Sequence, residues 1–259
     1  MPVLGLGVYQ IPSGRATEEA VKSALKVGYR HIDTASLYGN EESVGRAVRN
    51  SGVPRESVFV TTKLWNSDHG YEAAIRACES SLRRLGLGYI DLYLIHWPVP
   101  ERRSESWRAL TELQRRGLCR AIGVSNYTVR HLEELLDGSD VAPDVNQVEF
   151  NPFLYQKELL RFCDGHDIQL EAYSPLTRGY RFRHPTVVEV ARHYSKSPAQ
   201  VMIRWSLQHG LVVIPKSSRP ERILENSEVF DFEINSQDMA QLDGLGESLR
   251  TDWDPTDEP

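Results

Sequence analysis

Short runs of β-branched and aliphatic residues recur along the whole chain, and each is followed by a loop and then by an amphipathic helical pattern. Eight runs predict strands, at residues 4–7, 31–33, 59–63, 91–96, 121–125, 145–149, 169–173 and 211–215. Strands that alternate with helices in this way are typical of a parallel sheet covered by helices.

Start and stop signals for helices lie between the predicted strands. Thr17 precedes the apolar face of the first helix and Gly28 closes it. The segment from Ser197 to Gln200 places a serine before a proline and a glutamine three residues after the serine, which is the pattern of a capping box. We therefore predict a helix that runs from this segment to about Gln208.

The predicted strands favour a closed barrel over an open sheet. Nearly continuous apolar runs, such as residues 90–95, suit strands that are buried on both faces. The alternative is a doubly wound open sheet, but the first βα unit lacks its usual glycine pattern, since Gly5-Leu6-Gly7 is followed by no third glycine. The length of 259 residues suits a (β/α)8 TIM barrel, so we predict one domain over residues 1–259.

Composition excludes several classes of function. The formal net charge is −6, from 36 acidic and 30 basic residues spread along the chain, so we expect no nucleic acid and no membrane partner. Neither a signal peptide nor a membrane span is predicted. The three cysteines fit no disulfide framework and no metal site, and Cys78 and Cys163 fall on apolar helix faces. A reduced, cytoplasmic setting is expected.

Four polar residues are placed at the ends of consecutive predicted strands, where the catalytic groups of such barrels lie. Asp33 ends the second strand and Tyr38 follows in its loop, Lys63 ends the third strand, and His96 ends the fourth. Neighbouring strands are about 5 Å apart, so these side chains can meet in one pocket.

An acid, a cation, a phenol and an imidazole together can protonate an oxygen. We expect Lys63 to lower the pKa of Tyr38, Asp33 to keep Lys63 charged, and His96 to position a substrate carbonyl. Separately, Asp33 and Lys63 could be an ion pair at the barrel rim, Tyr38 could pack a loop, and His96 could be a core histidine. Their joint placement favours the catalytic interpretation.

Two further groups of residues suit a dinucleotide. Ser125, Asn126 and Gln147 could hold a carboxamide while the ring of Tyr173 stacks on a flat heterocycle, although Asn126 could also cap a helix and Tyr173 could fill the barrel.

Lys216, Ser217 and Arg222 follow the eighth strand and suit a phosphate, for which an adenosine 2′-phosphate is the preferred occupant. The loop at 178–183 carries Arg178, Arg181 and Arg183, which either cover a pyrophosphate or form a solvated basic loop.

Six segments resemble the motifs of aldo-keto reductases: GYRHIDTA at 28–35, YGNE at 38–41, LIHWP at 94–98, GVSN at 123–126, QVEFNP at 147–152 and IPKS at 214–217. The resemblance spans nearly the whole chain. It implies reduction of a small aldehyde or ketone by NADPH, with NADH less favoured, by a monomeric enzyme that needs no metal.

The resemblance also implies roles for individual residues. Asp33, Tyr38, Lys63 and His96 would form the catalytic tetrad. Cofactor contacts would come from Gly7, Val8, Asp33, Ser125, Asn126, Gln147, Tyr173, Ser174, Leu176, Ile214, Lys216, Ser217, Arg222 and Asn226. Substrate contacts would come from Tyr9, Tyr38, Trp65, His96 and Trp97.

Three features depart from fuller members of the family. The first strand lies close to Met1, so the hairpin that closes the barrel bottom is expected to be missing or truncated. Tyr9 stands where many relatives have tryptophan. The tail after Trp253 is short and acidic, so an abbreviated substrate loop is expected.

Two other functions fit the same sequence. A barrel that binds the cofactor without catalysis would be a sensor or a structural protein, and Lys63 at a strand end could form a Schiff base in an aldolase. The identity of the carbonyl substrate is not encoded in any motif.

Overall fold

Eight parallel strands form one sheet in chain order in the computed structural model, which describes residues 1–259. The strands are Leu6–Gly7 (β1), His31–Asp33 (β2), Phe59–Leu64 (β3), Ile90–Ile95 (β4), Cys119–Ser125 (β5), Val145–Glu149 (β6), Gln169–Tyr173 (β7) and Val212–Val213 (β8). All eight predicted strands are present, and those at 31–33, 145–149 and 169–173 have the predicted bounds.

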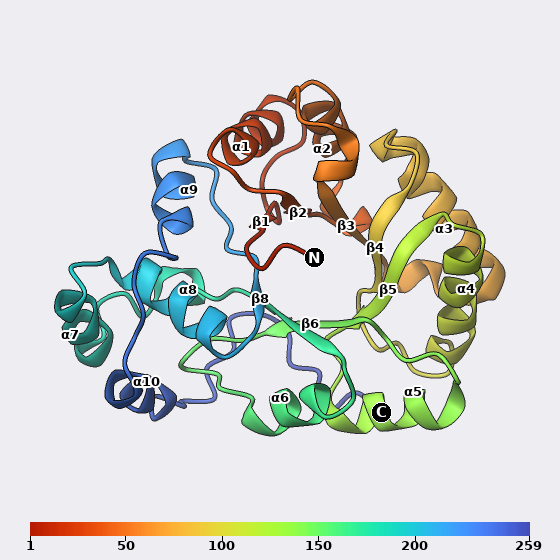
Figure 1. Ribbon diagram of the computed structural model, residues 1–259. Helices are drawn as coiled ribbons and strands as arrows, with labels where there is room; N and C mark the ends of the chain where they lie inside the picture. The colour runs from red at the N-terminus through yellow and green to blue at the C-terminus, as the bar shows by residue number, and fades with distance from the viewer.

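The sheet closes on itself next to β8. The backbone nitrogen of Val213 donates to the oxygen of Val3 at 2.9 Å, and the nitrogen of Gly5 donates to the oxygen of Val213 at 2.9 Å. A third bond runs from Gly7 to the oxygen of Pro215 at 3.2 Å. The strands therefore form the predicted (β/α)8 barrel, seen along its axis in Figure 1, and the open-sheet alternative is wrong.

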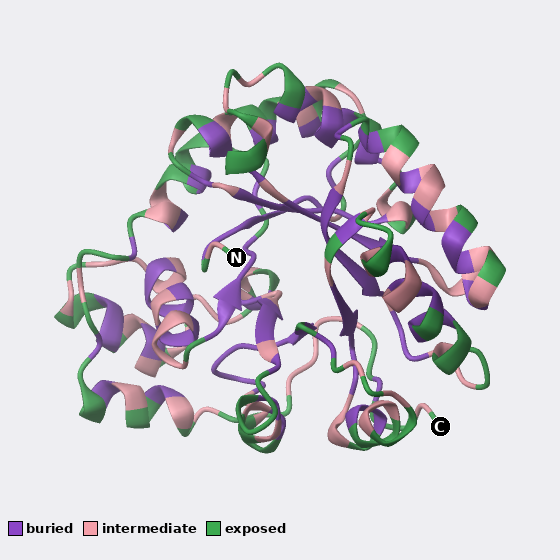
Figure 2. Ribbon diagram, turned by 45° about the vertical axis from the view of Figure 1, so that its right-hand side comes forward, coloured by how far each residue is buried: buried purple, intermediate pink, exposed green.

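Helices surround the strands on the outside. They are Arg15–Lys26 (α1), Glu41–Arg49 (α2), Tyr71–Leu85 (α3), Arg103–Arg115 (α4), Val129–Gly138 (α5), Lys157–Asp164 (α6), Pro185–His193 (α7), Pro198–Gln208 (α8), Pro220–Ser227 (α9) and Ser236–Asp243 (α10). Single 3₁₀ turns occur at Ser36–Tyr38 (η1), Arg55–Ser57 (η2), Asn66–Asp68 (η3) and Thr177–Gly179 (η4). Figure 2 shows buried strands inside a ring of helices whose outer faces are exposed. None of these helices has both the length and the apolar character needed to cross a membrane.

Several predicted element ends differ from those of the structure, and two of the differences have identifiable reasons. The last strand is shorter than the predicted 211–215, because Pro215 has no N–H to extend the ladder. Helix α1 begins at Arg15 rather than after Thr17, which is buried inside its first turn and donates its hydroxyl to the oxygen of Pro12 at 2.8 Å. Cys78 on α3 and Cys163 on α6 are buried, as predicted.

The predicted capping box is present at the start of α8. The hydroxyl of Ser197 accepts from the nitrogen of Gln200 at 3.3 Å, and the side-chain oxygen of Gln200 accepts from the nitrogen of Ser197 at 3.0 Å. Because each side chain satisfies a backbone donor at the helix start, the capping box stabilises the first turn of α8.

We expect Ser197→Ala to lower the free energy of unfolding by about 1 kcal/mol, since one backbone donor loses its acceptor. Urea unfolding measures this loss. The matched control is Ser80→Ala on α3, where the serine caps no helix start: its hydroxyl donates to the oxygen of Arg76 and accepts from the exposed guanidinium of Arg83. Equal stability of wild type and Ser197→Ala would contradict the prediction.

The barrel interior is polar near the carboxyl ends of the strands. Asp33, Lys63 and Gln147 lie there. His31 is two residues before Asp33 on β2, and Glu171 is two residues before Tyr173 on β7, so both also face the interior. The five side chains of this polar group are all buried. Buried polar groups require partners, so the hydrogen bonds among these residues determine what the site can do.

Candidate active site

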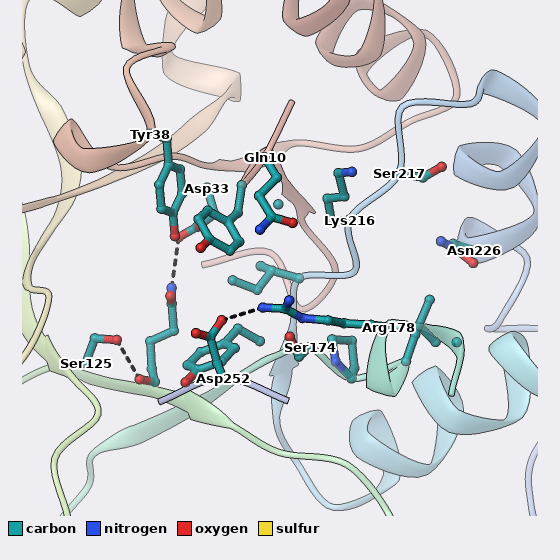
Figure 3. Close-up of a pocket in the computed structure, with 18 of the residues that line it drawn as sticks. Gln10, Asp33, Tyr38, Ser125, Ser174, Arg178, Lys216, Ser217, Asn226 and Asp252 are labelled. Atoms are coloured by element: carbon teal, nitrogen blue, oxygen red, sulfur yellow. Dashed lines mark hydrogen bonds and ion pairs between the residues drawn. The ribbon is translucent and has the colours of Figure 1, made fainter. Parts of the chain in front are cut away.

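The four residues predicted to be catalytic meet at the carboxyl end of the barrel. Asp33 is the last residue of β2, Lys63 lies near the end of β3, His96 directly follows β4, and Tyr38 ends η1. Figure 3 shows Tyr38 and Asp33 side by side on one wall of the pocket. The parallel arrangement of β2, β3 and β4 brings these side chains together, as the sequence indicates.

Lys63 is the centre of this group. Its Nζ donates to both carboxylate oxygens of Asp33, at 2.8 and 2.7 Å, and to the oxygen of Thr34 at 2.9 Å. The hydroxyl of Tyr38 lies 3.4 Å from the same nitrogen. Because the side chain of Lys63 is fully buried and paired, its position next to Tyr38 is fixed.

The ionisation of Tyr38 differs from the expectation. Burial, followed by the Asp33 carboxylate, raises the pKa of Tyr38 well above 10. The expected net lowering of this pKa is therefore wrong, because burial and then the Asp33 carboxylate outweigh the nearby Lys63 cation. The consequence is a phenol that keeps its proton at neutral pH.

His96 is uncharged. Burial and then the Lys63 cation hold the pKa of His96 well below 6.5. Its Nδ1 has no hydrogen-bond partner, and its ring packs edge-on against Tyr38, with ring centres 5.7 Å apart. A neutral imidazole beside a protonated phenol can orient a polar group without repelling the neighbouring cation.

The residues predicted to bind a carboxamide form a second connected group. The hydroxyl of Ser125 donates to the backbone oxygen of Gln147 at 2.8 Å, a bond drawn in Figure 3. The side-chain nitrogen of Asn126 donates to the backbone oxygen of His96 at 3.0 Å, and its oxygen accepts from the hydroxyl of Tyr173 at 2.8 Å. Asn126 does not cap α5, because Thr128 does so.

The residues predicted to bind a phosphate lie at the other end of the pocket. Lys216 and Ser217 follow β8, and Arg222 and Asn226 are four residues apart on one face of α9. Lys216 and Arg222 are exposed on the pocket wall, and neither forms an ion pair. Two cations are therefore available for an anion.

One cavity of about 590 Å³ joins these groups. Its wall includes all the predicted cofactor contacts except Val8, and all the predicted substrate contacts, namely Tyr9, Tyr38, Trp65, His96 and Trp97. Val8 is fully buried and does not reach the cavity. Lys63 is also absent from the wall and lies beneath it, next to Tyr38.

Asp252 and Trp253 form another wall of the cavity, and Thr251 precedes them. The hydroxyl of Thr251 donates to the Glu149 carboxylate at 2.6 Å, and Asp252 pairs with Arg178 at 2.9 Å, as Figure 3 shows. The ring of Trp253 lies 5.9 Å from that of Trp65 and equally far from that of Trp97. The segment after α10 therefore contributes two side chains, Asp252 and Trp253, to the cavity wall.

The three arginines after β7 have different surroundings. Arg178 lines the cavity, whereas Arg181 pairs with Glu247 at 2.7 Å and Arg183 is exposed away from the cavity. Of the three arginines only Arg178 lies on the cavity wall, together with Gly179 and Phe182 of the same loop.

Comparison with known families decides the identity of the barrel. The model of the aldo/keto reductase family matches residues 3–247. The chain belongs to the aldo-keto reductase family. It is therefore an oxidoreductase, and the resemblance inferred from the six motifs is confirmed.

Several relatives cover nearly the whole aldo-keto reductase chain. A glyoxal reductase from Bacillus subtilis is 51% identical, over 98% of this chain and 92% of its own length. A 9,11-endoperoxide prostaglandin H2 reductase from Trypanosoma cruzi is 49% identical over 98% of this chain and 91% of its own length. The crystal structure of an aldo-keto reductase from Bombyx mori in complex with NADP is 36% identical, has a TM-score of 0.90, and aligns over 96% of this chain and 91% of that one.

Several cavity residues of this aldo-keto reductase were not predicted from the sequence. Glu225 shares a face of α9 with Arg222 and Asn226, so the helical period could have revealed it. Asp252 and Trp253 carry no such signal, because their place depends on how the segment after α10 crosses the barrel. The other unpredicted residues are Gln10, Leu37, Pro175, Gly179, Phe182, Ser197, Pro198 and Ala199.

Proposed function

We propose that this aldo-keto reductase uses NADPH to reduce aldehydes or ketones to alcohols, with Tyr38 as the proton donor. The observation that carries the proposal is the single cavity that connects Tyr38 and His96 with the cations Lys216 and Arg222. A protonated phenol at one end suits a carbonyl oxygen, and the cations at the other end suit a nucleotide phosphate.

The donor set fits the cofactor. Amide and hydroxyl groups of Ser125, Asn126 and Gln147 can hold a carboxamide, and the ring of Tyr173 can pack against a nicotinamide. Lys216 and Arg222 can pair with a 2′-phosphate. When bound there, NADPH supplies a hydride for the carbonyl carbon.

Tyr38 delivers the proton in the proposed reaction. Its pKa, raised by burial and by Asp33, keeps the phenol protonated before the reaction. As negative charge develops on the carbonyl oxygen, the phenol transfers its proton and Lys63, at 3.4 Å, stabilises the tyrosinate that remains. The neutral His96 orients the same oxygen, and the surrounding aromatic side chains exclude water.

The relatives support this proposal in two ways. The Bacillus subtilis relative is named a glyoxal reductase, and glyoxal is a carbonyl compound. The structure of the Bombyx mori enzyme was solved in complex with NADP. An aldolase mechanism is disfavoured by the geometry of Lys63, because a nitrogen that donates to three oxygens has no lone pair directed at a substrate.

A panel of aldehydes, ketones and dicarbonyls, with NADPH consumption as the measurement, tests the proposed function. We expect NADPH oxidation with several members of the panel and an alcohol as product. NADPH binding, detected by quenching of tryptophan fluorescence, without turnover of any member would contradict the proposal and favour a sensor.

We expect Arg222→Ala to weaken NADPH binding about 10- to 100-fold and to leave NADH binding nearly unchanged, because only NADPH carries the phosphate that the guanidinium pairs with. Dissociation constants for both cofactors measure this effect. The matched control is Arg219→Ala, which removes an exposed arginine that does not line the cavity. Equal weakening of both cofactors would place the phosphate elsewhere.

A further inference from the structure

A second buried carboxyl group lies below the Asp33–Lys63 pair. Glu171 is on β7, and its side chain is fully buried. Tyr173, two residues later on the same strand, lines the cavity above it. Because side chains two residues apart on a strand share a face, Glu171 points into the barrel interior. No step of the proposed reaction uses this group.

The side-chain amide of Gln147 joins Glu171 to the catalytic group. Its Nε2 donates to Oδ2 of Asp33 at 2.8 Å and to Oε2 of Glu171 at 2.8 Å. These bonds use both hydrogens of the amide nitrogen. They also fix the orientation of the amide, because in the flipped orientation the amide oxygen would face the Asp33 carboxylate, and two acceptor oxygens repel each other. The oxygen of Gln147 is therefore the atom that can accept a hydrogen bond from a ligand.

Glu171 has little positive charge to compensate it. Among charged or titratable groups, His31 and Asp33 face it from β2 and Lys63 from β3, whereas its register partner on β8 is Val212. The Lys63 ammonium group already forms an ion pair with Asp33. Oε1 of Glu171 has no hydrogen-bond partner and lies 3.5 Å from Nε2 of His31.

These surroundings determine the protonation state. Burial, followed by the Asp33 carboxylate, raises the pKa of Glu171 to about 8. Burial lowers the pKa of His31 to about 3, so the imidazole is neutral and supplies no compensating charge. At neutral pH the Glu171 carboxyl therefore holds a proton, and alkaline solution adds a second negative charge beside Asp33.

We propose that Glu171 is a positioning residue for the reduction, which holds the Gln147 amide oxygen toward the cofactor and, when it ionises, weakens proton donation by Tyr38. The inference rests on the proposed function. A second carboxylate opposes formation of tyrosinate, because the Lys63 cation then faces two negative groups in place of one. The neutral carboxyl is the form that supports the reaction.

Two variants separate the two parts of this role. Glu171→Gln offers Gln147 an acceptor oxygen and cannot ionise, so we expect nearly normal NADPH affinity and turnover at pH 7. We also expect it to lack the fall in turnover that the wild type shows as the pH rises through about 8. Glu171→Leu removes the acceptor, and NADPH binding, measured by fluorescence quenching, should weaken about 3- to 10-fold, as for one lost hydrogen bond.

Thermal unfolding gives a measurement that needs no activity. The folded protein keeps the Glu171 proton up to about pH 8, whereas the unfolded chain loses it above about pH 4.5, so a rise in pH between these values favours unfolding. We expect this contribution to the fall in Tm to be absent in Glu171→Gln. The control is Glu41→Gln, which removes a buried glutamate that binds Thr62 and Arg84 away from the cavity and should retain the alkaline fall in turnover.

Three results would overturn the inference: a wild-type turnover that does not fall near pH 8, the same fall in Glu171→Gln as in the wild type, or unchanged NADPH affinity in Glu171→Leu. Failure of the proposed function is distinct, since the wild type would then consume no NADPH with any carbonyl compound while the binding and unfolding measurements would still report on Glu171.

Discussion

Tyr38→Phe is expected to lower turnover by a factor of roughly 100 or more, as is typical for loss of a general acid, and to leave NADPH binding largely intact. The substitution removes only the hydroxyl that lies 3.4 Å from Lys63, and the ring contacts with Tyr9 and His96 remain. Single-turnover NADPH oxidation measures the effect on the chemical step.

Tyr29→Phe is the matched control for Tyr38→Phe. It also removes a buried phenol hydroxyl, one that donates to the oxygen of Ile223 outside the cavity, so it should affect stability and leave turnover unchanged. Near-normal turnover in Tyr38→Phe would remove the phenol from the mechanism.

Lys63→Met is expected to have the largest effect on stability, because it leaves the Asp33 carboxylate buried without its cation. Breaking such a pair typically costs about 3–5 kcal/mol. Turnover should fall as well, since no cation remains to stabilise the tyrosinate of Tyr38. Urea unfolding and NADPH oxidation measure the two effects on the same preparation.

The double variant Asp33→Asn/Lys63→Met distinguishes the two effects. It removes both charges, so much of the stability lost in Lys63→Met should return, whereas turnover should stay low. Recovery of turnover together with stability would mean that the pair is only structural.

The strand pattern predicted the barrel because strands buried on both faces are mainly apolar. The capping box predicted the start of α8 because its two side chains act locally. The ends of helices and strands that depend on contacts with distant residues were harder to predict from the sequence. Thr17, for example, has the side chain of an N-cap but donates its hydroxyl to the preceding loop inside the first turn of α1.

The convergence of Asp33, Tyr38, Lys63 and His96 at one end of the barrel was predictable, because the ends of parallel strands in a barrel converge whatever their helices do. Their ionisation was not, since burial, followed by the Asp33 carboxylate, raises the pKa of Tyr38, and the depth of burial depends on the whole fold. Glu171 reads in sequence as an ordinary surface acid, although the polar residues at alternate positions from Gln169 to Tyr173 are consistent with one polar strand face.

The pairing of Val3 and Gly5 with Val213 has a consequence for synthesis of the chain. These partners are about 210 residues apart in sequence, so the ring of hydrogen bonds cannot close until almost the whole chain has left the ribosome. Until then, a growing sheet with β1 at one side keeps unpaired backbone groups at both of its edges, which are templates for pairing with other chains. Aggregation during expression, rather than loss of the finished fold, is the failure expected from substitutions that slow this last closure.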